Sequence, residues 1–193
     1  MLLQRLVESP LLVRGRKFSV RIYTVLVGDR IFLSRDGLVK LAAEPYNDDD
    51  NSSKLNPRVH LTNSGRELEM EQQTLDILSV HGIDTLRSSL VHIVRTVMIL
   101  YRESAVLTLP DQTFQGVAAL PQLRARLASL EIPKILGFDF VVDTSLQVWL
   151  VEINRFPGLE PRSSFDAAVK HNVVRAAWDF SHDNEALLQS LDL

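Results

Sequence analysis

The 193-residue chain contains no cysteine, which excludes disulfide bonds, thiolate metal sites and cysteine nucleophiles. It also lacks a long uncharged apolar run. The most apolar stretch, 86–109, is interrupted by Arg87, Arg95 and Arg102, and a stretch of that kind does not rest in lipid. Charges and a proline stand early in the N-terminal segment, where a signal peptide needs apolar residues. We therefore expect a cytoplasmic protein without a membrane partner.

The composition also excludes a disordered or fibrous chain, because 46% of the residues are hydrophobic and 23% are charged, as in ordinary globular domains. The charge is uneven. Residues 1–66 contain 11 basic and 7 acidic side chains, whereas residues 67–193 contain 10 basic and 17 acidic ones. A basic half in an acidic protein indicates anionic ligands, such as phosphates or acidic peptides, or else an ordinary solvated charged face.

The first part of the chain has the pattern of antiparallel strands. Residues 18–27 alternate and are rich in β-branched and aromatic side chains, which predicts a strand. Gly28-Asp29 is a hairpin turn signal, so 30–35 is predicted to be the return strand. Asp36-Gly37 is a second signal of the same kind and leads into a third strand, 38–42. Together these segments predict an antiparallel meander.

Helical and strand patterns follow in turn. Helices are predicted over 67–80, 85–101, about 121–130, and 164–180. Two apolar strands are predicted over 134–142 and 146–153, joined by a tight polar turn. This order of elements predicts an α+β fold with a mainly antiparallel sheet flanked by helices.

Three polar residues interrupt the two apolar strands near the C-terminal end. Glu152 and Asn154 are two apart and project from one face of their strand, and Asp139 can reach that face from the neighbouring strand. Two carboxylates and an amide are oxygen donors that suit Mg²⁺ bound together with nucleotide phosphates. The alternative is that the carboxylates face water at the sheet edge or pair with Arg155 and Arg162.

A second set of candidate residues is basic. Lys17, Arg21, Arg35 and Lys40 lie on the predicted N-terminal strands, and Lys17 and Arg21 share one face. A guanidinium group fits phosphate and carboxylate oxygens through two parallel hydrogen bonds. The set indicates either an anion-binding surface or an ordinary solvated face of the sheet.

The order of six motifs resembles that of tubulin–tyrosine-ligase-like enzymes. The motifs are Lys17-Phe18-Ser19-Val20-Arg21-Ile22-Tyr23, Ser34-Arg35-Asp36-Gly37-Leu38-Val39, Glu44-Pro45-Tyr46-Asn47, His60-Leu61-Thr62-Asn63, Gly137-Phe138-Asp139-Phe140 and Trp149-Leu150-Val151-Glu152-Ile153-Asn154. The resemblance runs from about Gln4 to Phe180, and Asp166 and Lys170 fit the family's ending. Six ordered motifs over that length make the resemblance specific.

This resemblance implies an ATP-grasp fold, in which ATP lies between two α+β lobes. It also implies an activity in which ATP and Mg²⁺ convert a carboxylate into an acyl phosphate, which an amino acid then attacks to form a peptide or isopeptide bond. The implied partners are the acidic C-terminal tail of tubulin and a free amino acid, with neither nucleic acid nor membrane. The implied location is cytoplasmic, at microtubules or cilia. Which amino acid is added does not follow from the sequence.

The resemblance also implies roles for individual residues. The implied Mg²⁺ ligands are Asp139, Glu152 and Asn154, and the implied catalytic set is Glu152, Arg21 and Arg35, with the two arginines binding phosphate and acyl phosphate. The implied nucleotide-binding residues are Gln4, Lys17, Thr62 and Asn63. Phosphoryl transfer needs positioning and charge neutralisation more than covalent help from the protein, so charged and amide side chains suit it.

The chain departs from the family pattern at three places. Ser19 stands where the family usually has aspartate, and Leu6 stands where the hinge usually has an aromatic residue. A lysine commonly follows the His-Leu-Thr-Asn motif, and here Arg66 is the nearest basic residue. We expect the contacts that these family residues make with nucleotide to be altered.

The hinge of the family falls at the start of this chain. We therefore expect residues 1–181 to correspond to the C-terminal part of the ligase domain, followed by a tail over 182–193, and the chain alone to bind ATP weakly and to ligate little. The alternatives are a catalytically inactive relative that retains affinity for tubulin, and an ATP-grasp ligase with another acceptor.

Overall fold

The structure of the chain, a computed structural model, describes residues 6–27, 30–47, 56–62, 71–80, 85–103, 133–178 and 187–191. Within this part of the chain, seven strands form one antiparallel sheet. The strands are β1 (Leu12–Val13), β2 (Arg16–Val27), β3 (Arg30–Leu41), β4 (Glu71–Thr74), β5 (Lys134–Val142), β6 (Val148–Asn154) and β7 (Leu188–Ser190). The helices are α1 (Pro57–His60), α2 (Asp76–Val80), α3 (Leu86–Glu103) and α5 (Ser164–Trp178).

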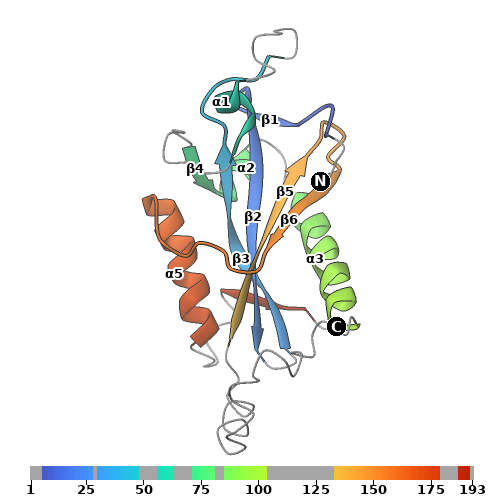
Figure 1. Cartoon of the computed structure of the whole chain (residues 1–193), viewed down its shortest axis with the longest axis vertical. Helices are drawn as coiled ribbons and strands as arrows, with labels where there is room; N and C mark the ends of the chain where they lie inside the picture. Colours follow the sequence, from blue (N-terminus) through green and yellow to red (C-terminus); the bar gives the residue numbers. More distant parts are fainter. Residues whose placement is uncertain are drawn as a thin grey trace, which may run out of the picture.

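The main path of the sheet is β4-β3-β2-β5-β6, with β1 paired to β2 and β7 paired to β3 (Figure 1). Central strand β2 is buried on both faces. Phe18 and Ile22 belong to the apolar cluster that contains α3, whereas Tyr23 and Val25 belong to the cluster that contains α5. Because successive side chains of a strand point to opposite faces, the two helices cover opposite faces of the sheet, on either side of it in Figure 1.

The two long helices match the sequence prediction in type and place. In α3, every fourth residue from Leu86 to Met98 is buried in the core, which is the narrow apolar stripe expected of a helix that packs against a sheet. The prediction for 164–180 corresponds to α5, which ends at Trp178. None of the helices in the described ranges has the length and apolar character needed to span a membrane.

The C-terminal strand pair also matches the prediction. β5 spans 134–142 as expected, and β6 begins two residues later than predicted, at Val148. The polar turn between them is held by Asp143, whose carboxylate accepts hydrogen bonds from the backbone N–H groups of Ser145 and Gln147, at 2.9 and 3.0 Å. The predicted α+β class, with an antiparallel sheet flanked by helices, is confirmed.

The predicted turn at Asp36-Gly37 is wrong, because β3 continues through both residues. The pairing of β3 with β2 changes register between Ile22 and Thr24 of β2, so the turn-type residues lie in an irregular part of one strand. Position 37 needs glycine, since a Cβ there would lie 2.6 Å from the backbone oxygen of Arg21. A turn signal can thus mark a close approach of two strands instead of a chain reversal.

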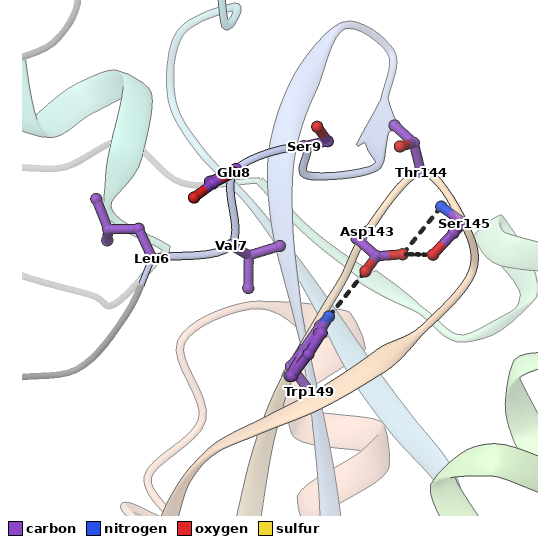
Figure 2. Close-up of a pocket in the computed structure, with 8 residues that line it drawn as sticks. All are labelled: Leu6, Val7, Glu8, Ser9, Asp143, Thr144, Ser145 and Trp149. Carbon is purple, nitrogen blue, oxygen red and sulfur yellow. Dashed lines mark hydrogen bonds between the residues drawn. The ribbon is translucent and has the colours of Figure 1, made fainter.

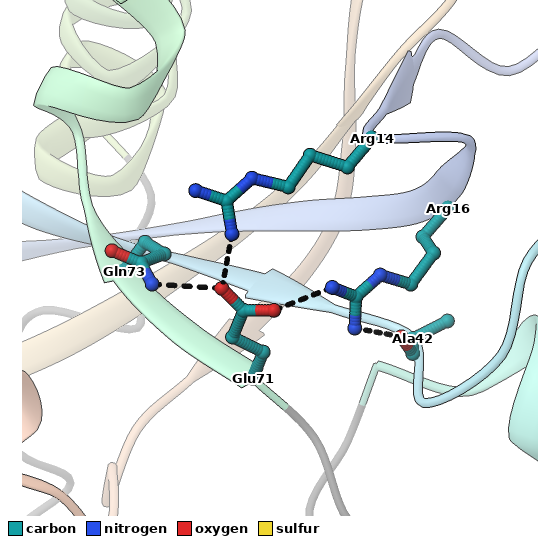
Figure 3. Close-up of polar contacts among 5 residues, drawn as sticks. All are labelled: Arg14, Arg16, Ala42, Glu71 and Gln73. Carbon is teal, nitrogen blue, oxygen red and sulfur yellow. Dashed lines mark hydrogen bonds and ion pairs between the residues drawn. The ribbon is translucent and has the colours of Figure 1, made fainter.

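The predicted helix over 67–80 is wrong over residues 71–74. These residues form β4, which pairs with Leu38–Leu41 of β3, and a helix begins only at Asp76. Glu71 is fixed at this edge by Arg14 and Arg16, with N–O distances of 2.6 and 2.5 Å (Figure 3). Pairing with β3 satisfies the hydrogen-bonding groups of that strand and outweighs a weak local preference for helix.

Two further predictions concern segments that the structure describes only in part or not at all. The predicted helix over 121–130 lies outside the described residues. Part of the segment expected to be a tail is described: residues 188–190 form β7, which pairs with residues 32–34 of β3.

Candidate functional site

Three charged residues lie in register across three neighbouring strands. Arg21 of β2 is paired with Asp139 of β5, and Asp139 is paired with Glu152 of β6. We call these three residues the charged row. Asn154 lies two residues beyond Glu152 and therefore on the same face of β6. Strand alternation thus brings the predicted metal ligands and one predicted catalytic arginine onto one face of the sheet.

Asp139 accepts hydrogen bonds from two residues, Arg21 and Asn154. Its carboxylate accepts hydrogen bonds from Nε of Arg21 at 2.6 Å, from a terminal nitrogen of the same guanidinium, and from Nδ2 of Asn154 at 3.0 Å. The Nζ atom of Lys40 lies 3.6 Å from Oδ1. Only 6% of Asp139 is exposed, so it neither faces water nor pairs with Arg155 or Arg162, the alternative partners weighed from the sequence.

The pKa values of the two cations beside Asp139 are shifted in opposite directions. Burial by itself lowers the pKa of Arg21, but the hydrogen bond and the charge of Asp139 outweigh it, so the pKa is raised. The pKa of Lys40 is lowered, chiefly by burial; Asp139 opposes this, whereas the charges of Arg21 and Lys170 add to it. One carboxylate is therefore shared by two buried cations, and it compensates Arg21 more fully than Lys40.

Glu152 differs from Asp139 in being exposed. No hydrogen bond is recorded for its carboxylate within the described ranges. The amide nitrogen of Asn154 is taken by Asp139, which leaves the carbonyl oxygen of Asn154 for another partner. The described residues contain no cluster of three or more histidine or acidic side chains that could hold a metal ion. Two carboxylates and one amide oxygen still fit Mg²⁺, which keeps waters and shares phosphate oxygens.

One polar cavity of about 370 Å³ lies between the charged row and α5. We call it the α5 cavity. Its charged and amide lining consists of Arg21, Lys40, Gln72, Glu152, Asn154, Glu160, Arg162, Asp166 and Lys170. Tyr23 also lines it, and burial raises the pKa of this tyrosine to about 12, so its hydroxyl stays protonated at neutral pH.

A second cavity, of about 280 Å³, lies at the other end of this face. We call it the Lys17 cavity. Two predicted nucleotide-binding residues, Lys17 and Thr62, line it together with apolar side chains that include Val7, Phe18 and Leu150. An apolar slot with a few polar groups is the usual form of a small-molecule site.

The ammonium group of Lys17 is held by two aromatic residues. Its Nζ atom lies 3.0 Å from Nδ1 of His60 and 4.0 Å from the centre of the Tyr46 ring. The two rings meet edge to face, with centroids 5.9 Å apart. A cation over an aromatic face is attracted by the ring quadrupole, so Tyr46 and His60 restrict where the Lys17 charge can lie.

The remaining predicted site residues are not gathered at either cavity. Arg35 is exposed on β3 and lines neither the α5 cavity nor the Lys17 cavity, and its backbone oxygen accepts a hydrogen bond from Arg87 at 2.5 Å. Gln4 and Asn63 lie outside the described residues. The roles of all three stay predictions.

A third cavity, of about 460 Å³, lies between the N-terminal segment and the β5–β6 turn (Figure 2). Trp149 lines both this cavity and the Lys17 cavity. Its indole Nε1 donates to Asp143 at 2.9 Å, and Figure 2 shows this bond beside those from Ser145. Hydrogen bonds from Ser145 and Trp149 are the main causes of the lowered pKa of Asp143. The turn thus fixes the orientation of Trp149.

Three residues of the site had no specific role in the sequence prediction: Lys40, Tyr46 and His60. The sequence indicates Lys40 only as one of several basic residues, and its place beside Asp139 depends on the register between β3 and β2, where it is paired with Ser19. Tyr46 and His60 lie in two of the motifs, but they are far from Lys17 in sequence, so no local pattern brings the three together.

Comparison with known proteins identifies the family. The family model described as "Tubulin-tyrosine ligase family" matches residues 1–185. A "Probable beta-tubulin polyglutamylase" of Tetrahymena thermophila is 24% identical over 89% of this chain and 16% of the relative. "Tubulin polyglutamylase TTLL7" of Mus musculus is 29% identical over 90% of this chain and 20% of the relative. "Probable tubulin polyglutamylase TTLL2" of Homo sapiens is 27% identical over 95% and 31%.

These alignments cover most of the chain but less than a third of each of the three relatives, so the chain spans only a part of their length. The family match itself extends over nearly all of the 193 residues and includes every residue of the charged row and of both cavities. The chain belongs to the tubulin-tyrosine ligase family.

Proposed function

We propose that the chain carries the metal- and phosphate-binding half of an ATP-dependent site that joins an amino acid to the acidic tail of tubulin. Membership of the tubulin-tyrosine ligase family supports ligase chemistry, and the names of the relatives, which are tubulin polyglutamylases, support tubulin as the acceptor. The observation that carries the proposal is the charged row, which lies between an apolar cavity and a polar one.

ATP is proposed to bind with its base in the Lys17 cavity. The apolar side chains suit an aromatic base, and Lys17 and Thr62 provide polar contacts at the same cavity. Gln4 and Asn63 are proposed to complete this set. The phosphates then extend along β2 from Lys17 towards Arg21, because the two residues lie on one face of that strand.

Mg²⁺ is proposed to be held by Asp139, Glu152 and Asn154, where it would neutralise phosphate charge during transfer. Arg21 uses two of its five N–H donors on Asp139, and the others are proposed to bind a phosphate or acyl-phosphate oxygen. Asp139 holds the guanidinium in place, so little ordering is required when the anion binds. Arg35 is proposed to contribute a second positive charge.

The proposed reaction has two steps. An oxygen of the acceptor carboxylate attacks the γ-phosphorus of ATP, and ADP leaves, which gives an acyl phosphate. The amine of the incoming amino acid then attacks the acyl carbon, loses a proton, and displaces inorganic phosphate. Arg21 and Lys40 contribute by balancing the negative charge that develops in both steps.

Calorimetry and an incorporation assay test the proposal. We expect the chain to bind ATP weakly and only with Mg²⁺, and to lose that binding on Glu152→Gln substitution. Incorporation of labelled glutamate, glycine or tyrosine into microtubules would show that the chain ligates by itself. Mg²⁺-dependent binding without incorporation would support a half-site, and a chain that binds no nucleotide at all would contradict the proposal in favour of an inactive relative.

A further inference from the structure

Three half-buried residues, Lys17, Tyr46 and His60, meet beside the Lys17 cavity, and Lys17 and His60 line it. They come from separate parts of the chain: Lys17 from β2, Tyr46 from the segment after β3, and His60 from the end of α1. The backbone N–H of Tyr46 donates to the backbone oxygen of Gly15 at 2.9 Å, which ties the tyrosine to the residues just before β2. We call these three residues the Lys17 cluster.

The short helix α1 fixes the position of His60. The side chain of Asn56 accepts a hydrogen bond from the backbone N–H of Arg58 at 3.0 Å, and Val59 is buried. The backbone N–H of Glu44 donates to the backbone oxygen of Arg58 at 3.0 Å, and the side chains of these two residues form an ion pair at 2.6 Å. The imidazole at the end of this helix is therefore held in place before any ligand binds.

The contact between Lys17 and His60 determines where the imidazole carries its proton. An ammonium group can only donate hydrogen bonds, so Nδ1 of His60, 3.0 Å from Nζ of Lys17, has to accept and cannot itself be protonated. Nζ also lies 4.0 Å from the centre of the Tyr46 ring, and an aromatic face attracts the charged form of lysine. His60 is therefore a neutral imidazole with its proton on Nε2.

Uptake of a second proton by His60 would remove this contact. An imidazolium has an N–H on both nitrogens and no acceptor, and it would place a second positive charge next to the Lys17 ammonium. Histidine side chains change charge between about pH 5 and 8. The contact is therefore present at the alkaline end of this range and is lost as the pH falls.

The charged groups around His60 do not offset this repulsion. Glu44 is the acidic residue that contacts α1, and its carboxylate is already paired with Arg58. The hydrogen bond from Arg58 is also the main cause of the lowered pKa of Glu44, so this pair keeps its charges where histidine titrates. The other described residues that line the Lys17 cavity are uncharged.

We propose that His60 is a positioning residue for Lys17, and that nucleotide binds with full affinity only while the His60 imidazole is neutral; this inference rests on the proposed function. A lysine held against Nδ1 and the Tyr46 ring loses little freedom when an anion binds to it. When His60 is protonated, the two cations repel each other and Lys17 has to leave this position. The nucleotide then has to order a free side chain, and its affinity falls.

The pH dependence of nucleotide affinity tests the proposal. Calorimetry measures binding of a non-hydrolysable ATP analogue with Mg²⁺ to the 193-residue chain at several pH values between about 5.5 and 8. We expect the wild-type affinity to fall about two- to twelvefold towards the acidic end, the scale of one lost hydrogen bond. Because the analogue also takes up protons, each variant is measured over the same pH series, and the profiles are compared.

His60→Asn is the decisive variant. The carbonyl oxygen of asparagine is as many bonds from the backbone as Nδ1 of histidine, and it accepts a hydrogen bond but does not titrate. Near pH 8 we expect its affinity to lie within about twofold of the wild type, and the additional loss at acidic pH to be absent. His60→Leu has no acceptor and should bind about two- to twelvefold more weakly near pH 8.

Two further variants serve as controls. His171→Asn removes an exposed histidine of α5 that does not line the Lys17 cavity, so it should keep the wild-type profile. Lys17→Met removes the residue through which His60 is proposed to act. It should bind weakly at every pH and show no more pH dependence than His60→Asn. A wild-type pH dependence in Lys17→Met would mean that His60 acts without Lys17 and would overturn the inference.

NMR of the imidazole nitrogens provides a measurement on the unaltered chain. Near pH 8 the ring of His60 should carry its proton on Nε2, with Nδ1 unprotonated. A proton on Nδ1 at this pH would contradict the contact from which the inference starts. This measurement does not depend on the folding of any variant or on nucleotide binding.

The outcomes separate this inference from the proposed function. Nucleotide binding with parallel pH profiles in the wild type and His60→Asn would overturn the inference and leave the proposed function standing. So would equal losses in His60→Asn and His60→Leu, which indicate that the ring acts through packing. An affinity that rises as the pH falls would show that the imidazolium binds phosphate directly and would also overturn the inference. A chain that binds no nucleotide at any pH would remove both.

Discussion

Arg21 and Asp139 are 118 residues apart in sequence, yet they face each other directly across β2 and β5 and are joined by two hydrogen bonds. Both are buried, at 8% and 6% exposure. This pair belongs at once to the core of the sheet and to the candidate site. A substitution in this pair should therefore change folding stability and ligand binding together. A substitution at an exposed site residue should change ligand binding alone, so comparing the two kinds of variant separates the two roles.

Arg21→Lys should lower the melting temperature, although lysine keeps the charge. Lysine cannot reproduce the two-pronged contact with the carboxylate, and we expect a loss of about 1–3 kcal/mol in the free energy of unfolding. For a chain of this size that corresponds to several degrees. Arg35→Lys is the matched control, because Arg35 is exposed on β3 and should leave the melting temperature almost unchanged. Thermal unfolding followed by circular dichroism measures both, and equal shifts would contradict the structural role of Arg21.

Glu152→Gln should have the opposite profile. Glu152 is exposed, and no hydrogen bond is recorded for it in the described ranges, so the melting temperature should hardly change. Loss of its charge should nevertheless abolish the Mg²⁺ dependence of nucleotide binding, and in any ligation assay the rate should fall by about two or more orders of magnitude. Asp76→Asn removes an exposed carboxylate at the start of α2 and serves as control. Unchanged Mg²⁺-dependent binding in Glu152→Gln would show that the metal is held elsewhere.

Tyr46 offers a test of the Lys17 cavity that leaves the lysine itself in place. Tyr46→Leu removes the ring that lies 4.0 Å from the Lys17 ammonium, a contact of about 0.5–2 kcal/mol. We expect nucleotide affinity to fall by about two- to thirtyfold. Tyr46→Phe keeps the ring and should bind nearly as the wild type does. Equal affinity in the leucine and phenylalanine variants would mean that the ring does not position Lys17.

The candidate site was predictable where it depends on a single strand or a short hairpin. Side-chain alternation alone puts Glu152 and Asn154 on one face of β6, and the tight turn before β6 brings Asp139 beside them. The pairing of Asp139 with Arg21 was not predictable in the same way, because the register between β2 and β5 depends on how the whole sheet packs. The sequence consequently indicates the three proposed metal ligands, but not the guanidinium of Arg21 that is hydrogen-bonded to one of them, Asp139.

The two errors in the fold have a similar origin. Asp-Gly is a common turn sequence, and Gly37 therefore predicts a turn. In the structure, Gly37 is needed for another reason: a side chain there would collide with the backbone oxygen of Arg21. Residues 71–74 have no strong preference of their own, and the free edge of β3 decides their conformation. In both places a long-range contact with a neighbouring strand, not the local pattern, selects the structure.

The edge strand β4 yields a prediction about pH. Glu71 accepts hydrogen bonds from Arg14, Arg16 and Gln73 (Figure 3). Partial burial by itself raises the pKa of Glu71, but these partners outweigh it, so the pKa lies below the ordinary value of 4.5. A carboxylate with a lowered pKa in the folded state stabilises the fold above its unfolded pKa. That contribution is lost as the pH falls through the folded-state value.

Glu71→Gln should therefore reduce the free energy of unfolding near neutral pH, by about 0.2–1 kcal/mol for each ion pair lost. Below pH 4.5 the difference in unfolding free energy between the variant and the wild type should shrink. The wild-type carboxylate becomes protonated there and, like glutamine, then carries no charge. Urea unfolding at a series of pH values measures this. Glu71→Gln made in a chain that already carries Arg14→Gln and Arg16→Gln is the control, and there the pH-dependent difference should be small. A difference of the same size at acidic and neutral pH would mean that Glu71 supports β4 through packing or through its bond to Gln73, and not through the two arginines.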